Sequence, residues 1–481
     1  MSINNLIKRL QDIMRQDAGV DGDAQRISQI VWLLFLKVYD AKEELWEFHD
    51  EAYTSIIPED LRWRNWAIDN KDGKALTGED LLNFINNVLF PTLKELEINE
   101  FTSKSSAIVK YVFEDAYNYM KNGVLLRQVI NLLNEVDFTE YQERHAFNDI
   151  YETILKDLQS AGNAGEYYTP RAITEFMVNV LKPQIGETVA DFAAGTGGFL
   201  ISALNYLDQQ VKTPKDREIL QSSLYGIEKK PLPHLLCVTN ILLHDIDNPE
   251  IDHKNSLEKN IRDYKEADKF NIIMMNPPFG GTEEESIKTN FPVEFRTSET
   301  ADLFLTLIMH RLKKKGRVGI VLPDGFLFGN DNAKMAIKQK LLNEFNLHTI
   351  VRLPNGVFAP YTDINTNLLF FDYNGKGTKE VWYYEHRLPE GYKKYTKTKP
   401  IKIQEFKAEE EWWNNRIETE VAWKVSKDDI IKRGYNLDIK NPNVEEEDLD
   451  HPEVILEKYN QSVQKVNEIQ DKIIAELRKI I

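Results

Sequence analysis

The sequence contains a single cysteine, Cys237, among its 481 residues. One thiol cannot close an internal disulfide, and it cannot supply the cysteine ligands of a structural zinc site. The nine histidines are scattered and form no His-Glu-x-x-His or similar cluster, which disfavours a metalloenzyme. We therefore expect a protein of a reducing compartment that holds no metal ion.

Long apolar runs are missing as well. The longest strongly apolar stretch, Ile30 to Leu36, is too short to cross a bilayer, and the segment from Met1 to Asn5 shows no signal-peptide core. The chain has 60 Lys and Arg against 77 Asp and Glu, a net charge of −17, so a small basic protein that coats nucleic acid is excluded. The net charge does not exclude a local basic groove. We expect a soluble, cytoplasmic protein of about three domains without a membrane partner.

Residues 1–150 are predicted to form an all-α N-terminal domain. Apolar residues recur at helical spacing in two early stretches, Leu6 to Met14 and Ile27 to Phe35. Polar breaks separate these stretches from later helical ones, and we find no catalytic signature among them. The simplest interpretation is a packed helical domain that does not carry the chemistry.

Residues 151–440 have a different pattern, in which short β-rich runs alternate with longer helical stretches. This alternation predicts an α/β domain with a parallel, Rossmann-like sheet and helices on both of its faces. A further run, Thr366–Asp372, is expected to add an edge strand. The other expected strands are Thr188–Phe192, Leu224–Glu228, Phe270–Met275, Arg317–Leu322 and Leu347–Leu353.

Residues 374–407 form a basic extension of this domain, with nine Lys or Arg against four acidic residues. Two interpretations of this extension stay open. It is either an exposed β-rich extension or a surface that contacts a nucleic-acid backbone through basic charge and aromatic faces. The aromatic residues among the charges are Trp382, Tyr383, Tyr384, Tyr392 and Tyr395.

The C-terminal part is predicted to be a linker followed by one helix. Residues 441–452 contain the acidic run Glu445–Asp450 and form the linker, and residues 453–481 form the helix. Its apolar residues follow heptad spacing, with Gln470 as the one polar position. They are Leu456, Tyr459, Val463, Val466, Ile473, Leu477 and Ile480. This stripe needs a partner, either helices of the same chain or another subunit.

The most informative segment runs from Val189 to Phe199 and reads Val-Ala-Asp-Phe-Ala-Ala-Gly-Thr-Gly-Gly-Phe. A buried strand ends at Asp191, and the small residues after it let the backbone approach a ligand at the carboxyl edge of a sheet. The loop lacks the third glycine of the dinucleotide fingerprint and the Gly-Lys-Ser/Thr of a P-loop. An acid without a lysine suits a cationic ligand without phosphate, and S-adenosylmethionine, with its ammonium and sulfonium groups, fits that description.

Two flanking segments support this cofactor site. Glu228 ends the next expected strand, where its carboxylate can accept both hydroxyls of a ribose. Upstream, a helix is expected to begin near Pro170, with Thr169 as its N-cap and Pro170 at its first position. The free amide groups of that helix start would point at a carboxylate, such as the methionine end of the cofactor.

A second motif, Asn276-Pro277-Pro278-Phe279, follows the expected strand Phe270–Met275. Two consecutive prolines remove two amide donors and stiffen the turn, so the Asn276 side chain and the Pro277 carbonyl can face one point. Two acceptors suit a planar amino group, whose nitrogen lone pair is then directed at an incoming methyl group. Phe279 offers an apolar face on which a flat ring can stack. We interpret this motif as an amine-methylating pocket that aligns the nucleophile with the sulfonium methyl.

The order of these motifs resembles that of amino-group DNA methyltransferases whose cofactor motifs come first. Glu-Tyr-Tyr-Thr-Pro precedes Asp-Phe-Ala-Ala-Gly-Thr-Gly-Gly, which precedes Asn-Pro-Pro-Phe. The helical N-terminal domain, the segment Gly434-Tyr435-Asn436-Leu437-Asp438 and the heptad tail narrow the resemblance. Over nearly its whole length the chain is similar to the modification (methylation) subunits of type I restriction-modification systems.

The resemblance implies roles for individual residues. Asn276, Pro277, Pro278 and Phe279 would hold an adenine flipped out of DNA, whose N6 receives the methyl group. Asn255 stands where the family often has an adenine-contacting acid, so its role stays open. The residues implied to contact S-adenosylmethionine are Glu166, Tyr167, Tyr168, Thr169, Pro170, Arg171, Asp191, Ala193, Gly195, Thr196, Gly197, Gly198 and Glu228.

The resemblance also implies partners. These are double-stranded DNA, one specificity subunit bound by two copies of this chain, and a restriction or motor subunit. The N-terminal domain would then help to clamp DNA or partners, and the tail would dock on the specificity subunit. Because a partner would read the sequence, an acidic chain needs only a basic channel near its pocket.

Other methyl-transfer chemistries were weighed against this interpretation. Cytosine C5 methylation needs a thiolate, but Cys237 lies in an apolar helical context and is expected to be a core residue. N4 of cytosine stays possible, since the pocket binds an exocyclic amine. Enzymes that methylate the glutamine side-chain amide of proteins share Asn-Pro-Pro, but the helical domain and the heptad tail favour DNA. A non-catalytic scaffold that only binds cofactor and the specificity subunit is disfavoured by the complete motif Asn276–Phe279.

Overall fold

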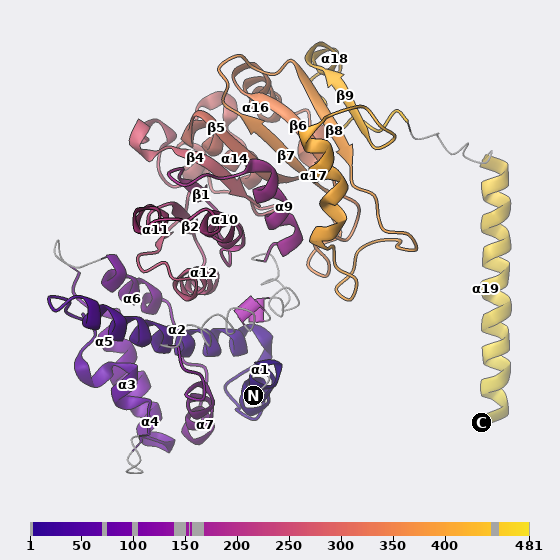
Figure 1. The fold of residues 1–481 in the computed structure, drawn as a ribbon. Helices are drawn as coiled ribbons and strands as arrows, with labels where there is room; N and C mark the ends of the chain where they lie inside the picture. The colour runs from indigo at the N-terminus through magenta and orange to yellow at the C-terminus, as the bar shows by residue number, and fades with distance from the viewer. Residues whose placement is uncertain are drawn as a thin grey trace. The chain divides into compact units, whose positions relative to one another are not determined.

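A nine-stranded sheet lies at the centre of the part that follows residue 168 (Figure 1). The computed structural model describes residues 3–69, 75–98, 104–138, 151–152, 154–155, 168–443 and 452–480. The strand order is β3-β2-β1-β4-β5-β7-β6-β8-β9. The strands are β1 (Val189–Asp191), β2 (Leu224–Glu228), β3 (Glu250–His253), β4 (Phe270–Met275), β5 (Leu312–Pro323), β6 (Asn346–Arg352), β7 (Thr366–Asp372), β8 (Glu380–Glu385) and β9 (Ala422–Ser426).

Strands β1 to β5 run parallel to one another, so their carboxyl ends meet at one edge of the sheet. Val189 of β1 pairs with Leu224 of β2 on one side and with Ile272 of β4 on the other. The chain therefore leaves β1 towards one side and later returns to its other side. In open α/β sheets, ligands bind in the crevice that this reversal creates beyond the carboxyl ends.

The prediction that Thr366–Asp372 is an edge strand is wrong. This strand, β7, lies between β5 and β6 and runs antiparallel to both. Residues 366–371 are all buried, as is typical of a strand that is covered on both faces. The misplacement arose because β7 follows β6 in sequence but inserts between β5 and β6 in the sheet. The strands β8 and β9, which were not foreseen, extend the sheet beyond β6.

Helices cover both faces of the sheet, as the alternating pattern predicted (Figure 1). The side chains of β4 alternate between the two cores, with Ile272 and Met274 in one and Ile273 and Met275 in the other. The first core contains α9 (Arg171–Leu181), α10 (Gly198–Asp208) and α17 (Lys407–Asn414). The second contains α14 (Thr300–Arg311), α15 (Asp324–Phe328), α16 (Asn332–Glu344) and α18 (Lys427–Lys432). Two further helices are α11 (Pro214–Gln221) and α13 (Glu285–Lys288).

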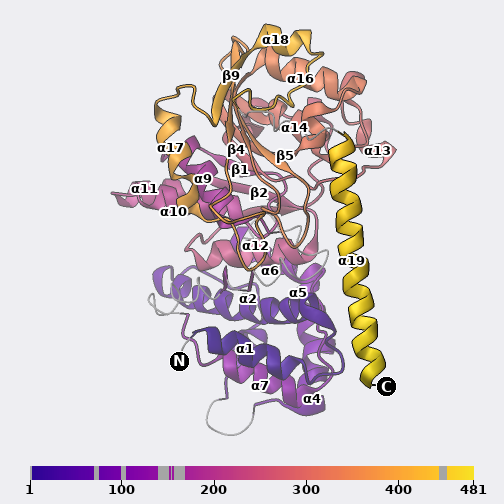
Figure 2. The ribbon, with the colours of Figure 1, turned by 90° about the vertical axis from the view of Figure 1, so that its right-hand side faces the viewer.

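The N-terminal part is helical, and it packs on α12 (Pro231–Leu243) of the sheet-bearing part (Figure 2). Leu235, Leu236 and Leu242 of α12 belong to the same apolar core as the helices of the first 138 residues. A buried lysine, Lys42, adds a polar link, because its Nζ lies 2.8 Å from Asp245 and 3.1 Å from Asp247. The helices are α1 (Ile3–Met14), α2 (Gly22–His49), α3 (Trp63–Trp66), α4 (Gly78–Phe84), α5 (Phe90–Lys94), α6 (Lys104–Glu114) and α7 (Gly123–Leu133).

Residues 440–481 form a separate unit, most of which is the helix α19 (Pro452–Ile480). The described side chains of the heptad stripe are exposed, with exposed fractions between 40% at Val463 and 64% at Tyr459. Leu477 and Ile480, also predicted to belong to the stripe, have side chains outside the described set. Among the described residues, no helix is both long and apolar enough to span a membrane.

Candidate active site

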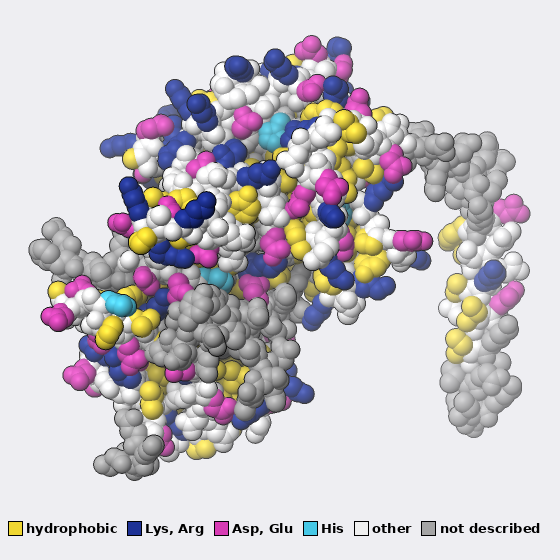
Figure 3. Space-filling view, in the orientation of Figure 1, with side chains coloured by type: hydrophobic (Ala, Val, Ile, Leu, Met, Phe, Trp, Pro, Cys, Tyr) yellow, Lys and Arg dark blue, Asp and Glu magenta, His cyan; other side chains and the backbone are white. Residues whose placement is uncertain are grey.

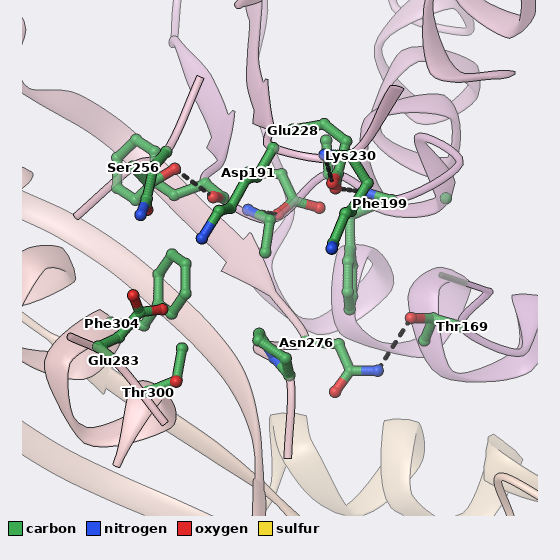
Figure 4. Close-up of a pocket in the computed structure, with 18 residues that line it drawn as sticks. Thr169, Asp191, Phe199, Glu228, Lys230, Ser256, Asn276, Glu283, Thr300 and Phe304 are labelled. Carbon is green, nitrogen blue, oxygen red and sulfur yellow. Dashed lines mark hydrogen bonds between the residues drawn. The ribbon is translucent and has the colours of Figure 1, made fainter. Parts of the chain in front are cut away.

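One cavity opens at the carboxyl edge of the sheet, beyond β1, β2 and β4 (Figure 4). It brings residues of the glycine loop, the end of β2 and the Asn-Pro-Pro-Phe motif together with the start of α14. The described residues that line it are Thr169, Asp191, Phe192, Ala193, Ala194, Gly195, Gly198, Phe199, Glu228, Lys229, Lys230, Asn255, Ser256, Asn276, Pro278, Glu283, Thr300 and Phe304.

The glycine loop connects β1 to α10 and is supported from below by α12. Gly197 has a φ of 82°, a left-handed conformation that favours glycine. A Cβ atom at this position would lie only 2.9 Å from the Sγ of Cys237 on α12. The side-chain amide of Asn240, one turn further along α12, donates to the carbonyl oxygen of Thr196 at 3.1 Å. The loop is therefore held in one shape by the helix beneath it.

Cys237 is fully buried, and burial raises the pKa of its thiol well above the usual range. The thiol is thus held in its neutral form, which is a poor nucleophile. This confirms the expectation of a core cysteine and argues against cytosine C5 chemistry at this residue.

Asp191 ends β1, is buried and lines the cavity. Its Oδ1 accepts a hydrogen bond from the backbone amide of Ala193 at 3.0 Å, whereas its Oδ2 has no hydrogen-bond partner among the described residues. Burial, together with the nearby charge of Glu228, raises the pKa of Asp191 to about 8. An unsatisfied buried carboxyl group of this kind suits a cationic ligand, because a positive charge beside it would stabilise its ionised form.

Glu228 lines the same cavity, but both of its oxygens already accept hydrogen bonds. Its Oε2 accepts from the amide of Gly195 at 2.9 Å, and its Oε1 accepts from the amide of Lys230 at 2.8 Å. Burial raises the pKa of Glu228 in spite of these bonds, which act in the opposite direction. Each oxygen keeps a second lone pair, so the carboxylate can still accept a ribose hydroxyl. Nothing in the sequence indicated that the Glu228 carboxylate also holds the glycine loop in place through the amide of Gly195.

Asn276 follows β4, and its side chain is oriented by Thr169 (Figure 4). The Nδ2 of Asn276 donates to the Oγ1 of Thr169 at 3.2 Å, across 107 residues of sequence. Its Oδ1 is buried and has no partner in the described part of the chain. The amide is therefore held through one of its two N–H groups while its acceptor stays free, as an incoming amino group requires.

The predicted start of the helix α9 is wrong by one residue. Thr169 is not the N-cap, because α9 begins at Arg171 and Pro170 is its N-cap residue. No side chain of the described residues caps this helix. The Thr169 hydroxyl serves Asn276 instead, so the sequence located the correct segment but assigned this threonine the wrong partner.

Two aromatic rings meet beside the motif. The half-buried ring of Phe279 lies edge-on to Phe358, with ring centroids 6.0 Å apart and an interplanar angle of 90°. Phe358 follows β6, 79 residues further along the chain, and no sequence signal pointed to it. Pro278 lines the cavity, whereas Pro277 and Phe279 are not among its lining residues.

The residues predicted to bind the cofactor divide into three groups. Six of them line the cavity: Thr169, Asp191, Ala193, Gly195, Gly198 and Glu228. Five others, Tyr168, Pro170, Arg171, Thr196 and Gly197, are not among its lining residues. The remaining two, Glu166 and Tyr167, fall outside the residues that the structure describes.

Arg171 is engaged away from the cavity. Its Nε lies 2.8 Å from the Oε2 of Glu152, and its Nη2 bonds the other oxygen of the same carboxylate. The guanidinium also lies over the ring of Tyr168, 5.4 Å from the ring centroid. A Cβ atom at Gly198 would collide with Arg171, so this glycine is needed for close packing. Arg171 thus supports the start of α10 from outside the cavity.

Several lining residues were not found by sequence reasoning. Lys229 and Lys230 directly follow Glu228, and their position after a strand-end acid was a usable signal. Thr300 and Phe304 of α14 carried no such signal, because nothing in the sequence places that helix beside β4. Asn255, whose role stayed open, lines the cavity, and its Oδ1 accepts from the amide of Leu257 at 3.0 Å.

Comparison with known proteins identifies the family of this chain. The sequence model of the N-6 DNA methylase family matches residues 142–451, and that of the HsdM N-terminal domain matches residues 3–133. The methylase subunit of the type I restriction enzyme EcoEI from Escherichia coli is 55% identical, over 98% of this chain and 97% of that one. The corresponding StySJI subunit from Salmonella typhimurium is 29% identical, over 80% and 72%.

Solved structures give the same result. A modification subunit assigned to a type I restriction enzyme of Vibrio vulnificus YJ016 is 44% identical, with a TM-score of 0.82 over 93% of this chain and 98% of that one. A chain from a study of assembly and conformational transition in a type I restriction-modification system is 36% identical, with a TM-score of 0.83 over 99% and 98%. The fold and the family matches define a DNA methyltransferase. The chain belongs to the N-6 DNA methylase family, as a methylase subunit of the type I restriction-modification class.

Proposed function

We propose that this chain transfers a methyl group from S-adenosylmethionine to N6 of an adenine flipped out of DNA. The observation that carries the proposal is a single cavity in which the acids Asp191 and Glu228 lie with the amide of Asn276. A cation-binding end and an amine-binding end thus share one space. When bound, S-adenosylmethionine supplies an electrophilic methyl group on a sulfonium.

The cofactor end is built for a cationic nucleoside without phosphate. Asp191 offers its unpartnered Oδ2 to a positive group, and Glu228 offers the remaining lone pairs of its carboxylate to the ribose. The backbone of Gly195 to Gly198 leaves room for the ligand along the loop. Asn255, which also lines the cavity, would contact the adenine ring of the cofactor in this proposal. Arg171 and Tyr168 act indirectly in this proposal, by supporting the loop.

The base end is built for an amino group on a flat ring. Asn276 presents a free acceptor whose orientation Thr169 fixes in advance. The Pro277 carbonyl would supply the second acceptor, although Pro277 itself is not among the residues that line the cavity. Phe279, backed by Phe358, forms the wall on which the base stacks. Because the base must leave the duplex, DNA contacts elsewhere have to offset an unstacking cost of a few kcal/mol.

The partners follow from the family rather than from the cavity. We infer that two copies of this chain bind one specificity subunit, that this subunit reads the DNA sequence, and that a restriction subunit can join. Full-length similarity to a type I methylase subunit supports this assembly. The exposed heptad stripe of α19 is the surface that we assign to the specificity subunit.

The deciding experiment is nucleoside analysis of DNA methylated by this chain together with its cognate specificity subunit. We expect N6-methyladenine with the wild-type chain. The variant Asn276→Ala should form none while binding S-adenosylmethionine with an unchanged dissociation constant, measured by calorimetry, because its side chain serves the base and not the cofactor. N4-methylcytosine as the product, or lost cofactor binding in the variant, would contradict the proposal.

A further inference from the structure

The basic extension at residues 374–407 is divided by the sheet into two halves. Lys376 and Lys379 precede β8, whereas residues 386–402 follow it. β8 runs parallel to β6, and β6 runs in the same direction as β5, since both are antiparallel to β7. The first half therefore lies at the amino edge of the sheet. The second half leaves the sheet at the carboxyl edge, where Asn276 also lies.

Most aromatic residues of this extension pack inward. Tyr383, Tyr384 and Tyr395 are buried in the cores of the sheet-bearing part, and Trp382 and Tyr392 are half-buried. The two half-buried rings already face lysines of the same chain: Lys424 lies over the ring of Trp382 and Lys399 over that of Tyr392. A nucleic-acid surface that uses both charge and aromatic faces is thus not what this extension forms. Only its basic side chains remain available to a ligand.

Those basic side chains gather in the second half. Between Arg387 and Lys402 the chain has six basic residues and one acid, in a protein whose net charge is −17. Lys393, Lys397 and Lys399 are exposed, and Figure 3 shows dark-blue side chains on the loops of this region. Among the described residues, no carboxylate lies within 4.0 Å of Lys393, Lys397 or Lys402, whereas Lys394 pairs with Asp363 at 3.0 Å. We call residues 391–402 the lysine loop.

The lysine loop is anchored by one buried side chain, that of Tyr395. Its hydroxyl donates to the carboxylate of Glu405 and lies 3.1 Å from the Nε2 of His386. His386 in turn contacts the buried Glu409 through its Nδ1, at 2.5 Å. This network fixes the middle of the loop to the body of the protein, so that the lysines on either side project from a rigid base.

The same anchor ties the loop to the wall of the base pocket. The amide of Tyr395 donates to the carbonyl oxygen of Asn355 at 3.1 Å. Gly356, with a φ of 84°, packs so closely on the backbone of Tyr395 that a Cβ atom would not fit. Phe358, two residues later, is the ring that meets Phe279. Backbone contacts thus connect the lysines to the aromatic wall.

We propose that the lysine loop binds phosphates of the DNA strand beside the flipped base. Lys393, Lys397 and Lys402 are exposed and have no carboxylate within 4.0 Å among the described residues, which is what phosphate binding needs. Contacts of this kind carry no sequence preference. The anchor at Tyr395 sets the distance between these phosphates and the aromatic wall, so that contact with the backbone helps to place the base. This inference rests on the proposed function, because it needs DNA as the substrate.

The test compares two double variants in the full chain with its specificity subunit. K393Q/K397Q removes two charges at the carboxyl edge, and the matched control K376Q/K379Q removes two at the amino edge. The probe is the DNA duplex that the wild-type complex methylates. Each lost phosphate contact should reduce the slope of log affinity against log salt by about 0.9, so the first variant should lose about 1.8 and the control nothing. The KM for DNA should rise severalfold in the first variant at unchanged kcat.

The two proposals fail in different ways. If the wild-type complex methylates no DNA, the proposed function fails. If it methylates DNA but K393Q/K397Q keeps the wild-type salt slope and KM, or if the control changes both to the same extent, the lysine loop is not the phosphate contact. Thermal unfolding and S-adenosylmethionine binding should be equal in all three proteins, since every substituted side chain is exposed.

Discussion

Asp191 and Glu228 are both buried acids of one cavity, yet their hydrogen bonding differs. The backbone occupies both oxygens of Glu228, whereas Asp191 keeps one oxygen without a partner among the described residues. The sequence predicted both acids, because each ends a strand at the carboxyl edge. It could not predict Thr169 as the partner of Asn276, or Phe358 as the partner of Phe279. Those contacts join residues 107 and 79 positions apart, and no local pattern encodes them.

Replacing Glu228 should weaken cofactor binding without unfolding the protein. We expect Glu228→Ala to weaken the binding free energy of S-adenosylmethionine by about 1.5–3 kcal/mol, the range for a hydrogen bond to a charged group. Calorimetry measures this change directly. Glu218→Ala, at an exposed position on α11, is the matched control and should bind as the wild type does. An unchanged dissociation constant in the Glu228 variant would rule out the ribose role.

Asp191 should make the stability of the ligand-free protein depend on pH. Its pKa is raised from the usual 3.8 to about 8 in the folded state, so between these values the folded state binds more protons than the unfolded state. Stability therefore decreases as the pH rises from about 4 to about 8. Asp191→Asn removes this titration. The melting temperature of the variant minus that of the wild type should therefore be larger at pH 8.5 than at pH 5, by at least about 2 °C. A constant difference across this range would refute the assignment.

At the scale of elements, sequence periodicity predicted the central strands well. β2, β4 and β7 have the predicted bounds, because each is a short apolar run between clear turn signals. Position in the sheet was harder to predict. β7 was expected at an edge, but it inserts between β5 and β6. The sheet ends instead in β8 and β9, whose residues mix charge with aromatics. The same mixture made the basic extension ambiguous, since only tertiary packing shows that its tyrosines face a core.

The helix α19 should be required for assembly and dispensable for folding. Deletion of residues 453–481 removes an exposed stripe from a unit separate from residues 1–439, so the remaining chain should keep its melting temperature and bind cofactor. It should no longer co-purify with the specificity subunit. Val466→Glu, within the stripe, should weaken co-purification more than Asn467→Glu beside it. Wild-type recovery of the complex with the deleted chain would contradict this prediction.

At the scale of the whole molecule, the helical part and the sheet-bearing part share one core. Residues of α12 belong to the apolar cluster of the N-terminal helices, and Lys42 of α2 bridges Asp245 and Asp247 beyond the end of α12. The sequence predicted both parts but gave no sign of this shared core. The sequence pattern of an apolar helix such as α12 is the same whether the helix packs on its own sheet or on another layer.

Lys42→Ala should destabilise residues 1–439 as a unit. The substitution removes the buried ammonium group and with it both ion pairs, and it leaves two half-exposed carboxylates close together. The loss should lower the free energy of unfolding by about 1.5–3 kcal/mol. Urea denaturation measures this loss, and a single transition is expected because the core is continuous. Lys8→Ala, exposed on α1, is the control and should lose less than about 0.5 kcal/mol. Two separate transitions would show that the parts fold independently.

The position of α12 between two layers has a practical consequence for hybrid proteins. One side of this helix packs with the N-terminal helices through Leu235 and Leu236, while Cys237 and Asn240 lie against the loop at Gly197 and Thr196. A chimera that joined the first 150 residues of one relative to the remainder of another would set foreign side chains against α12. Exchange of the helical part should therefore carry α12 with it, and the donor of that helix would then also determine how well the glycine loop is supported.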